Sequence, residues 1–247
     1  MKKIHIIIGG KGGCGKSHAS SVMSQFLLSI YNGQIEIFDT DQVNPTLSEY
    51  TALNVEHFSL LDDNKNINKR NFDILFERLI ISDKKHIVVD TGSNTYMPLL
   101  EYAGDINLFR QLEDFDCEVI FHLILAGGDM YETTLSGVEN VLSTFKIRSV
   151  IWLNEHFGSL RNAQEASIFH DKNPLNSLVI GAMLLQQYDK NTFGEDLKMM
   201  SQKRLTMEQV MSDPDFMIMS RMRVKKVYSE YFRRLSALEI FSAVVEE

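Results

Sequence analysis

A glycine-rich stretch near the start of the chain, residues 9–20 (GGKGGCGKSHAS), restricts the possible folds more than any other part of the sequence. It follows the short apolar run Ile4–Ile8 and precedes a helical pattern that begins at Lys16. Residues 10–17 fit the pattern G-x-x-x-x-G-K-[ST], whose glycines let successive backbone N–H groups converge on phosphate oxygens. The order of strand, glycine loop and helix therefore predicts a phosphate-binding loop.

The loop contains two lysines, Lys11 and Lys16, although one lysine is enough to neutralise a phosphate chain. The pattern gives that task to Lys16, and it gives Mg²⁺ binding to the hydroxyl of Ser17. The helix that starts here adds the positive end of its dipole to the same site. Lys11 therefore needs a second explanation.

Three aspartates follow apolar strands, at the end where an open parallel sheet binds its ligands. Asp39 and Asp41 come after the run IEIF, and Asp90 comes after HIVV. Because side chains alternate along an extended chain, we expect Asp39 and Asp41 to point the same way, toward the phosphate loop. Carboxylates in this place can hold the waters of Mg²⁺ or position an attacking water, although aspartates also cap turns and helix starts.

Short apolar runs alternate with longer helical patterns along the chain, which is typical of a parallel α/β sheet. The runs that predict strands are Ile4–Ile8, Gln34–Phe38, His86–Val89, Val119–Leu125, Val150–Leu153 and Leu178–Ile180. Helical patterns cover Lys16–Tyr31, Lys69–Ile81, Pro98–Phe109, Thr133–Phe145, Ala163–His170, Phe193–Met211 and Met219–Val244. Several strands are continuous β-branched runs, which predicts a mostly parallel, twisted sheet with helices on both faces. No repeat or Pro/Gly-rich linker divides the sequence, so we expect a single domain over residues 1–247.

The net charge of −8 argues against a surface that binds nucleic acid all round. The charge is uneven, however, because residues 198–234 hold nine Lys/Arg against four Asp/Glu. Such an excess is either a solvated helix face or a surface for DNA. The candidate DNA contacts are Lys198, Lys203, Arg204, Arg221, Arg223, Lys225 and Lys226.

The same part of the chain is rich in methionine, at Met199, Met200, Met207, Met211, Met217, Met219 and Met222. Methionine fills irregular gaps in cores and also occurs on adaptable binding surfaces, and core packing is the simpler interpretation. At the other end of the chain, the first apolar run is too short for a signal peptide or a membrane span. Cys14 and Cys117 are far apart and form no disulfide-like or metal-like pattern, so we expect a cytoplasmic protein without a membrane span.

Four segments together resemble the ParA/MinD family of ATPases. Residues 11–17 (KGGCGKS) resemble its deviant Walker A loop, KGGxGK[ST], and residues 39–47 (DTDQVNPTL) resemble its first switch. Residues 86–92 (HIVVDTG) are similar to its Walker B strand and second switch. Residues 150–154 (VIWLN) are similar to the late strand whose last asparagine recognises adenine. The motifs occur in the family's order, and their combination is much more specific than any single one.

The resemblance implies a P-loop NTPase fold, ATP as the nucleotide and Mg²⁺ as the metal. Lys11, Lys16 and Asp41 would be catalytic, with Asp41 orienting the attacking water. The metal would be served by Ser17, Asp39 and Asp90, of which Asp90 acts through water and Asp39 supports the site. The nucleotide would contact Gly10, Gly12, Gly13, Cys14, Gly15, Lys16, Ser17, His18 and Asn154.

The resemblance also accounts for Lys11. In the family, the lysine at this place reaches across an ATP-bound homodimer to the phosphates held by the other subunit. A cation supplied in this way acts like an arginine finger and makes hydrolysis depend on dimerisation. We therefore expect a slow, partner-stimulated ATPase in which ATP joins two copies face to face and hydrolysis releases them.

The sequence departs from the family pattern at three places. Glu155 follows the asparagine where arginine is usual, His18 stands where threonine or serine is usual, and no proline pair follows Asp90. The compact length, the lack of an N-terminal DNA-binding domain and residues 38–50 look most like plasmid-borne TraL/StbB-type ATPases. Because that ParA-like group is linked to conjugation and plasmid stability, we expect a plasmid or transfer complex as cargo and a protein partner from that system.

Two other functions fit the same phosphate loop. A small-molecule ligase or kinase of the dethiobiotin-synthetase kind would phosphorylate a small carboxylate and would not need Lys11 from a second subunit. A nucleotide-binding module without catalysis is the third possibility, and the presence of Lys11, Lys16, Asp41 and Asp90 argues against it. Turnover stimulated by DNA or a partner would favour the switch, and fast turnover with a metabolite would favour the ligase.

Overall fold

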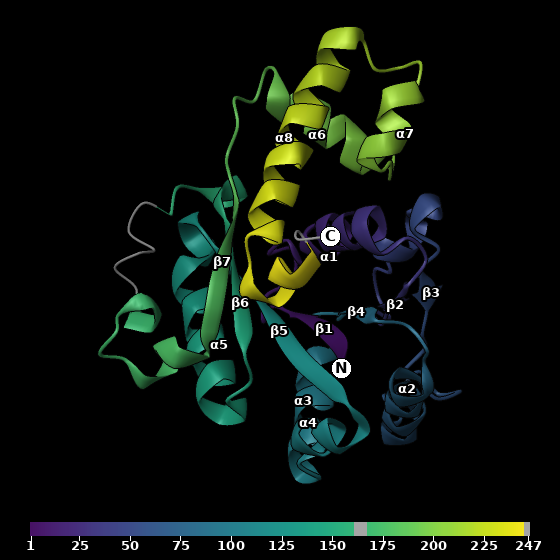
Figure 1. Cartoon of the computed structure of the whole chain (residues 1–247), viewed down its shortest axis with the longest axis vertical. Helices are drawn as coiled ribbons and strands as arrows, with labels where there is room; N and C mark the ends of the chain where they lie inside the picture. Colours follow the sequence, from purple (N-terminus) through teal and green to yellow (C-terminus); the bar gives the residue numbers. More distant parts are fainter. Residues whose placement is uncertain (161–166, 245–247) are drawn as a thin grey trace.

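The computed structural model describes residues 1–160 and 167–244, and its centre is a seven-stranded sheet. The strand order is β3-β2-β4-β1-β5-β6-β7, and every neighbouring pair is parallel. The strands are Lys2–Ile8 (β1), Ile35–Asp39 (β2), Glu56–His57 (β3), His86–Asp90 (β4), Cys117–Ala126 (β5), Ser149–Asn154 (β6) and Val179–Leu185 (β7). The predicted parallel sheet is confirmed, and β1 lies at its middle (Figure 1).

Helices cover both faces of the sheet, as predicted (Figure 1). On one face lie α1 (Lys16–Tyr31) and α8 (Ile218–Ser236). On the other face lie α2 (Lys69–Ile81), α3 (Tyr96–Asp105), α4 (Leu108–Gln111) and α5 (Tyr131–Phe145). Within the described ranges, no helix is long and apolar enough to cross a bilayer.

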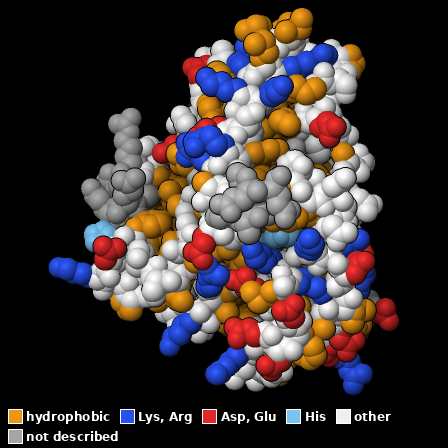
Figure 2. All heavy atoms as spheres, viewed as in Figure 1, with side chains coloured by type: hydrophobic (Ala, Val, Ile, Leu, Met, Phe, Trp, Pro, Cys, Tyr) orange, Lys and Arg blue, Asp and Glu red, His pale blue; other side chains and the backbone are white. Residues whose placement is uncertain are grey.

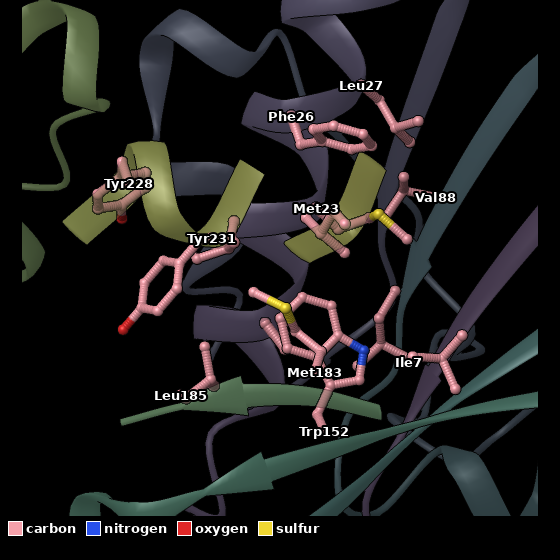
Figure 3. Close-up of a cluster of buried hydrophobic side chains, with 14 of the residues drawn as sticks. Ile7, Met23, Phe26, Leu27, Val88, Trp152, Met183, Leu185, Tyr228 and Tyr231 are labelled. Atoms are coloured by element: carbon pink, nitrogen blue, oxygen red, sulfur yellow. The ribbon is translucent and has the colours of Figure 1, made fainter. Parts of the chain in front are cut away.

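The core under α1 and α8 explains why these segments are helical. Met23, Phe26 and Leu27 recur three and four residues apart, so one side of α1 is apolar and packs against the sheet. Figure 3 shows these side chains above Trp152 of β6, which is completely buried. The alternation of side chains along each strand sends the neighbouring apolar residues to the opposite face, where they meet α2 to α5.

Two predicted helices are each divided in the structure. The segment predicted as Pro98–Phe109 forms α3 and α4, because Asn107 between them has a φ of 52° that interrupts a right-handed helix. The segment predicted as Phe193–Met211 forms α6 (Phe193–Gln202) and α7 (Met207–Ser212), with Arg204 at a φ of 52° between them.

The other predicted elements agree more closely with the structure. α1 and α2 have the predicted bounds, and each predicted strand overlaps an observed one. The last predicted helix becomes α8 followed by a 3₁₀ turn at Glu239–Val244. Half of the predicted helix Ala163–His170 lies outside the described residues, and the described half contains a 3₁₀ turn at Ser167–Phe169. The two-residue strand β3 was not predicted, because it is too short to show a pattern.

One end of the molecule lies beyond the sheet and consists of α6, α7 and the first half of α8 (Figure 1). Met200 is buried in this end, and Met199, Met207 and Met211 pack partly buried around the same core. Met217, Met219 and Met222 are instead exposed. The predicted core packing therefore holds for part of the methionine-rich segment and is wrong for its last three members.

The parallel direction of the strands brings their carboxyl ends to one edge of the sheet. The glycine loop leaves β1 there, and Asp39 at the end of β2 lies directly opposite Asp90 at the end of β4. Asn154 ends β6 at the same edge, two strands from β1. The fold thus assembles four separate sequence motifs into one region.

Candidate functional site

The glycine loop between β1 and α1 depends on backbone shapes that only glycine adopts easily. Gly13 and Gly15 have φ angles of +75° and +108°. A Cβ atom on Gly15 would also lie 2.4 Å from the amide nitrogen of Asn154, and one on Gly9 would lie 2.6 Å from Sγ of Cys14. These glycines keep the loop tight against the ends of β1 and β6.

Asn154 holds the loop in this position. Its Nδ2 donates a hydrogen bond of 2.8 Å to the carbonyl oxygen of Cys14, and its Oδ1 accepts one of 3.0 Å from the backbone N–H of His156. The asparagine predicted to recognise adenine therefore also joins β6 to the phosphate loop. One Nδ2 hydrogen and the rest of the acceptor capacity of Oδ1 remain for a ligand.

The two lysines of the loop lie in different surroundings. Lys16 begins α1 and is only 6% exposed, with its aliphatic chain folded back over Gly9. Lys11 is exposed, and its ammonium has no hydrogen-bond or ion-pair partner among the residues that the structure describes. Lys16 therefore faces into the loop, and Lys11 is accessible from outside.

Asp90 at the end of β4 is completely buried, and its two oxygens differ. Oδ1 accepts a hydrogen bond of 2.8 Å from the hydroxyl of Ser20 in α1. Oδ2 is buried and has no hydrogen-bond partner in the described part of the chain. Burial, together with the charge of Asp39, raises the pKa of Asp90 to about 7, and the nearby Ser17 hydroxyl opposes this shift. A buried carboxylate oxygen without a partner, beside a second carboxylate and a serine hydroxyl, fits a divalent cation with oxygen ligands.

Asp39 is also buried, but its carboxylate is occupied. Oδ1 accepts from the backbone N–H of Asp41 at 3.0 Å. Oδ2 accepts from the N–H and the hydroxyl of Ser48, at 3.0 and 3.1 Å. Burial raises the pKa of Asp39, and these hydrogen bonds partly counteract the effect. Asp39 therefore ties the segment 41–48 to the sheet next to Asp90, which agrees with a supporting role at a metal site.

Asp41 lies just beyond β2 and is partly exposed. Its Oδ1 accepts from the backbone N–H groups of Val43 and Asn44, at 2.9 and 3.0 Å, so it caps a turn. It also lies against the loop that follows β4, because a Cβ atom on Gly92 would come within 2.9 Å of its carboxyl carbon. Asp41 thus joins the two loops that follow β2 and β4, with its second oxygen not engaged in this turn.

An open pocket of about 650 Å³ begins at the glycine loop and extends between the ends of β6 and β7 and the helix α6. Its lining includes Gly13, Gly15 and His18 from the loop and α1, Asn154 from the end of β6, and Lys198 from α6. This volume is in the range of small-molecule sites. Burial, with the neighbouring His156, lowers the pKa of His18 to about 4, so this imidazole is neutral at pH 7.

Several residues of the site were not predicted. Ser20 and Ser48 hold the two buried aspartates. Glu155 accepts hydrogen bonds from the N–H groups of Leu160 and Gln187, at 3.1 and 3.5 Å, and so links the loops after β6 and β7. A signal for Ser20 exists in the sequence, because a serine on the buried side of an amphipathic helix requires a polar partner. Ser48 and Glu155 each follow a motif segment directly, but neither motif assigns them a partner, and the α6 wall comes from a segment without a recognisable motif.

The basic residues predicted as DNA contacts lie in the end formed by α6 to α8, and several are paired. Lys203 forms ion pairs with Asp213 and Asp215, both at 2.7 Å. Arg204 pairs with Glu49 at 2.6 Å, and Arg223 pairs with Asp196. Lys198 lines the pocket. Much of the positive charge in residues 198–234 therefore stabilises contacts within the chain.

Comparison with known proteins gives two full-length relatives. One is the protein TraL of Escherichia coli, 32% identical over 244 residues, which covers 97% of this chain and 100% of the relative. A second Escherichia coli TraL is 31% identical over 239 residues, covering 95% of this chain and 98% of the relative. No family model matches the sequence.

Solved structures share the fold at low sequence identity. The septum site-determining protein MinD of Pyrococcus horikoshii, complexed with Mg-ADP, has a TM-score of 0.55 and 14% identity, with 96% of this chain and 98% of that chain covered. The MinC:MinD cell division complex of Aquifex aeolicus gives a TM-score of 0.52 and 10% identity, with 92% and 95% covered. The predicted ParA/MinD-like P-loop NTPase fold is therefore confirmed.

Proposed function

The chain belongs to the family of TraL proteins, and we propose that it is an ATP-dependent molecular switch with a slow ATPase activity. The observation that supports this most is that two buried polar groups beside the glycine loop lack a partner in the described part of the chain. Lys16 is buried there without an ion-pair partner in the described chain, and Asp90 has a buried oxygen without a hydrogen bond. A triphosphate with its cation satisfies both groups at once.

In this proposal the phosphates of ATP lie in the loop 10–17, and Lys16 neutralises their charge. Ser17 and Asp90 would hold Mg²⁺, which would supply positive charge beside the phosphates. Asp39 keeps the segment 41–48 in place, and the unengaged oxygen of Asp41 orients the attacking water. The adenine occupies the pocket beside Asn154 and His18.

Lys11 completes the site from a second copy of the chain. Its exposure and the lack of a partner in the described residues leave its ammonium available to an approaching subunit. A cation that arrives only with the partner stabilises the charge of the transition state only in the dimer. ATP would therefore close a homodimer, and hydrolysis would open it.

The role of the switch would be in plasmid transfer or stability. This part of the proposal rests on membership of the TraL family and on the resemblance to TraL/StbB-type ATPases. Internal ion pairs occupy Lys203, Arg204 and Arg223, so a protein of the transfer system is a better-supported partner than non-specific DNA. We propose that the protein acts in the cytoplasm, as a single ATPase domain.

The proposal is tested with Asp41→Ala, which removes the group that orients water but leaves Lys11 and Lys16 in place. We expect wild-type protein to hydrolyse ATP slowly, and the variant to remain a dimer with ATP and Mg²⁺ but not with ADP. Sedimentation velocity measures the dimer, and GTP in place of ATP tests the base preference. Asp83→Ala, which changes an exposed aspartate far from the loop, serves as the matched control. A variant that stays monomeric with ATP would contradict the proposal, and fast turnover with a small carboxylate would favour the ligase.

A further inference from the structure

The tip where α7 leads into α8 exposes a group of large apolar side chains. Met217, Ile218, Met219 and Met222 are between 60% and 76% exposed. Ile218 and Met219 come four and three residues before Met222 and so lie on its side of α8, and Met217 directly precedes the helix. We call this group of side chains the tip (Figure 2). An exposed apolar patch on an otherwise polar end of a protein indicates an interaction site.

Positive charge borders the tip. Between Ile218 and Lys226, α8 carries four cations and no carboxylate. Arg223 is paired with Asp196, but Lys225 and Lys226 are exposed on the same side of the helix as Met222, one turn further along. A partner for this surface must offer apolar side chains surrounded by carboxylates.

The opposite end of the molecule has that chemistry. Residues 101–116, which form the end of α3, α4 and the turn that follows, contain five carboxylates and a single cation, Arg110. Asp105 pairs with Lys69 and Asp116 pairs with the N-terminal amine. The remaining three carboxylates, Glu101, Glu113 and Asp114, are exposed and have no ion pair among the described residues. Ile106 and Phe115 are 41% and 57% exposed among these carboxylates. We call this surface the acidic end, and Figure 1 shows that α3 and α4 lie at the far end of the long axis from α7.

From this complementarity we infer that the tip of one copy binds the acidic end of a second copy, which produces head-to-tail chains. The two surfaces are different, so the contact is heterologous, and an assembly of any length keeps one unused tip at one end and one unused acidic end at the other. Neither surface includes the glycine loop or Lys11, so this contact is separate from the ATP-dependent dimer proposed above. It would connect ATP-loaded dimers into larger assemblies.

An anionic membrane is a weaker match to the tip. Glu208 is exposed on α7 and has no ion pair among the described residues, and the chain as a whole has a net charge of −8. A negatively charged bilayer would repel this negative charge. Membrane binding by the tip would also leave the exposed apolar side chains of the acidic end without a partner.

The test is sedimentation of nucleotide-free protein over rising concentration, at low and at high salt. We expect species larger than a dimer at low salt, and their loss at high salt because salt screens the bordering charges. Ile218→Glu at the tip and Phe115→Lys at the acidic end should each abolish these species. Both residues are exposed, and an unchanged thermal midpoint would confirm that the variants fold.

Mixing the two variants separates this contact from any symmetric one. Ile218→Glu retains its acidic end and Phe115→Lys retains its tip, so an equimolar mixture should form one-to-one dimers and nothing larger. Ile30→Glu, an exposed apolar residue outside both surfaces, should behave as wild type. Wild-type protein that stays monomeric at low salt, or a mixture that does not pair, would overturn the inference. So would binding of the tip to phosphatidylserine vesicles without self-association, measured by co-sedimentation.

Discussion

Two groups of buried polar side chains in this molecule differ in whether they find hydrogen-bond partners inside the chain. At the carboxyl edge of the sheet, Lys16 and Asp90 are buried with groups that no described residue satisfies. Deeper in the core, a line of three histidines and a tryptophan is joined by hydrogen bonds along its whole length. Both groups are costly to bury, and only the second is compensated within the chain.

The buried line crosses four adjacent strands. Nε1 of Trp152 donates to Nδ1 of His122 at 2.9 Å, which fixes the proton of His122 on Nε2. His122 then donates to His5 at 3.0 Å, and His5 donates to His86 at 2.9 Å. Burial lowers the pKa of His122 and of His86 to about 3, and it lowers that of His5 well below its usual value. The three histidines are therefore uncharged at pH 7, and their hydrogen bonds stabilise the sheet.

The difference between the groups identifies the side chains that await a ligand. Where a buried polar group has a partner inside the chain, its removal should change stability. Where a buried polar group has no partner inside the chain, removal of that group should weaken ligand binding and leave the free energy of unfolding nearly unchanged or raise it. Asn154 and Asp39 combine both situations, since they hold loops and also face the site.

The largest effect is expected for Lys16→Ala, which removes a buried group without a partner at the carboxyl edge of the sheet. Loss of the cation under the phosphates should lower ATP turnover by roughly 10²–10³-fold, the usual cost of one electrostatic donor to a transition state. The free energy of unfolding without nucleotide should hardly change, because Lys16 makes no ion pair in the described chain. Turnover assays and urea unfolding measure the two quantities, with Lys65→Ala as the control on an exposed lysine. If Lys16→Ala were strongly destabilised but kept normal turnover, Lys16 would serve the fold and not the nucleotide, which would contradict the account.

A smaller effect is expected for His86→Gln in the satisfied line. The unfolded chain protonates His86 below about pH 6.5, whereas the folded protein keeps it neutral to about pH 3. The unfolded state therefore binds more protons in this window, and the free energy of unfolding falls as the pH falls. Each such histidine contributes a slope that approaches about 1.4 kcal/mol per pH unit near pH 5 and is about half as steep near pH 6.5, and His86→Gln should remove one such contribution.

The control for this prediction is His170→Gln, which replaces an exposed histidine. Urea unfolding between pH 5 and pH 7 should give this variant the wild-type slope. ATP turnover at pH 7 should be nearly normal in both variants, because neither histidine faces the glycine loop. An unchanged slope in His86→Gln would show that the buried line does not stay neutral.

The residues of the proposed nucleotide site could be recognised from the sequence because each motif is a short, continuous segment. The glycine loop, the two aspartate segments and the asparagine each follow a strand, and parallel strands must end at one edge. The histidine line was not predictable, since His5, His86 and His122 are far apart in the chain and look like ordinary strand residues. Their meeting depends on the register of β1 with β4 and β5.

The other differences also come from tertiary context. The breaks at Asn107 and Arg204 are single left-handed residues inside helical patterns, and a pattern of apolar spacing does not detect them. The ion pairs of Lys203 and Arg204 join segments that are distant in sequence, so a count of charges could not separate them from a DNA surface. The exposure of Met217, Met219 and Met222 depends on where α8 begins relative to α7.

The central claim, that Lys11 acts on the phosphates of the other subunit, is tested most directly by mixing two inactive variants. Lys11→Ala lacks the cation but keeps its own Asp41, and Asp41→Ala lacks the water-orienting group but keeps its Lys11. Each alone should bind ATP and hydrolyse almost none. In an equimolar mixture, mixed dimers contain one complete site, so turnover should recover to roughly a quarter of the wild-type rate. Full activity of Lys11→Ala alone, or no recovery in the mixture, would contradict the account.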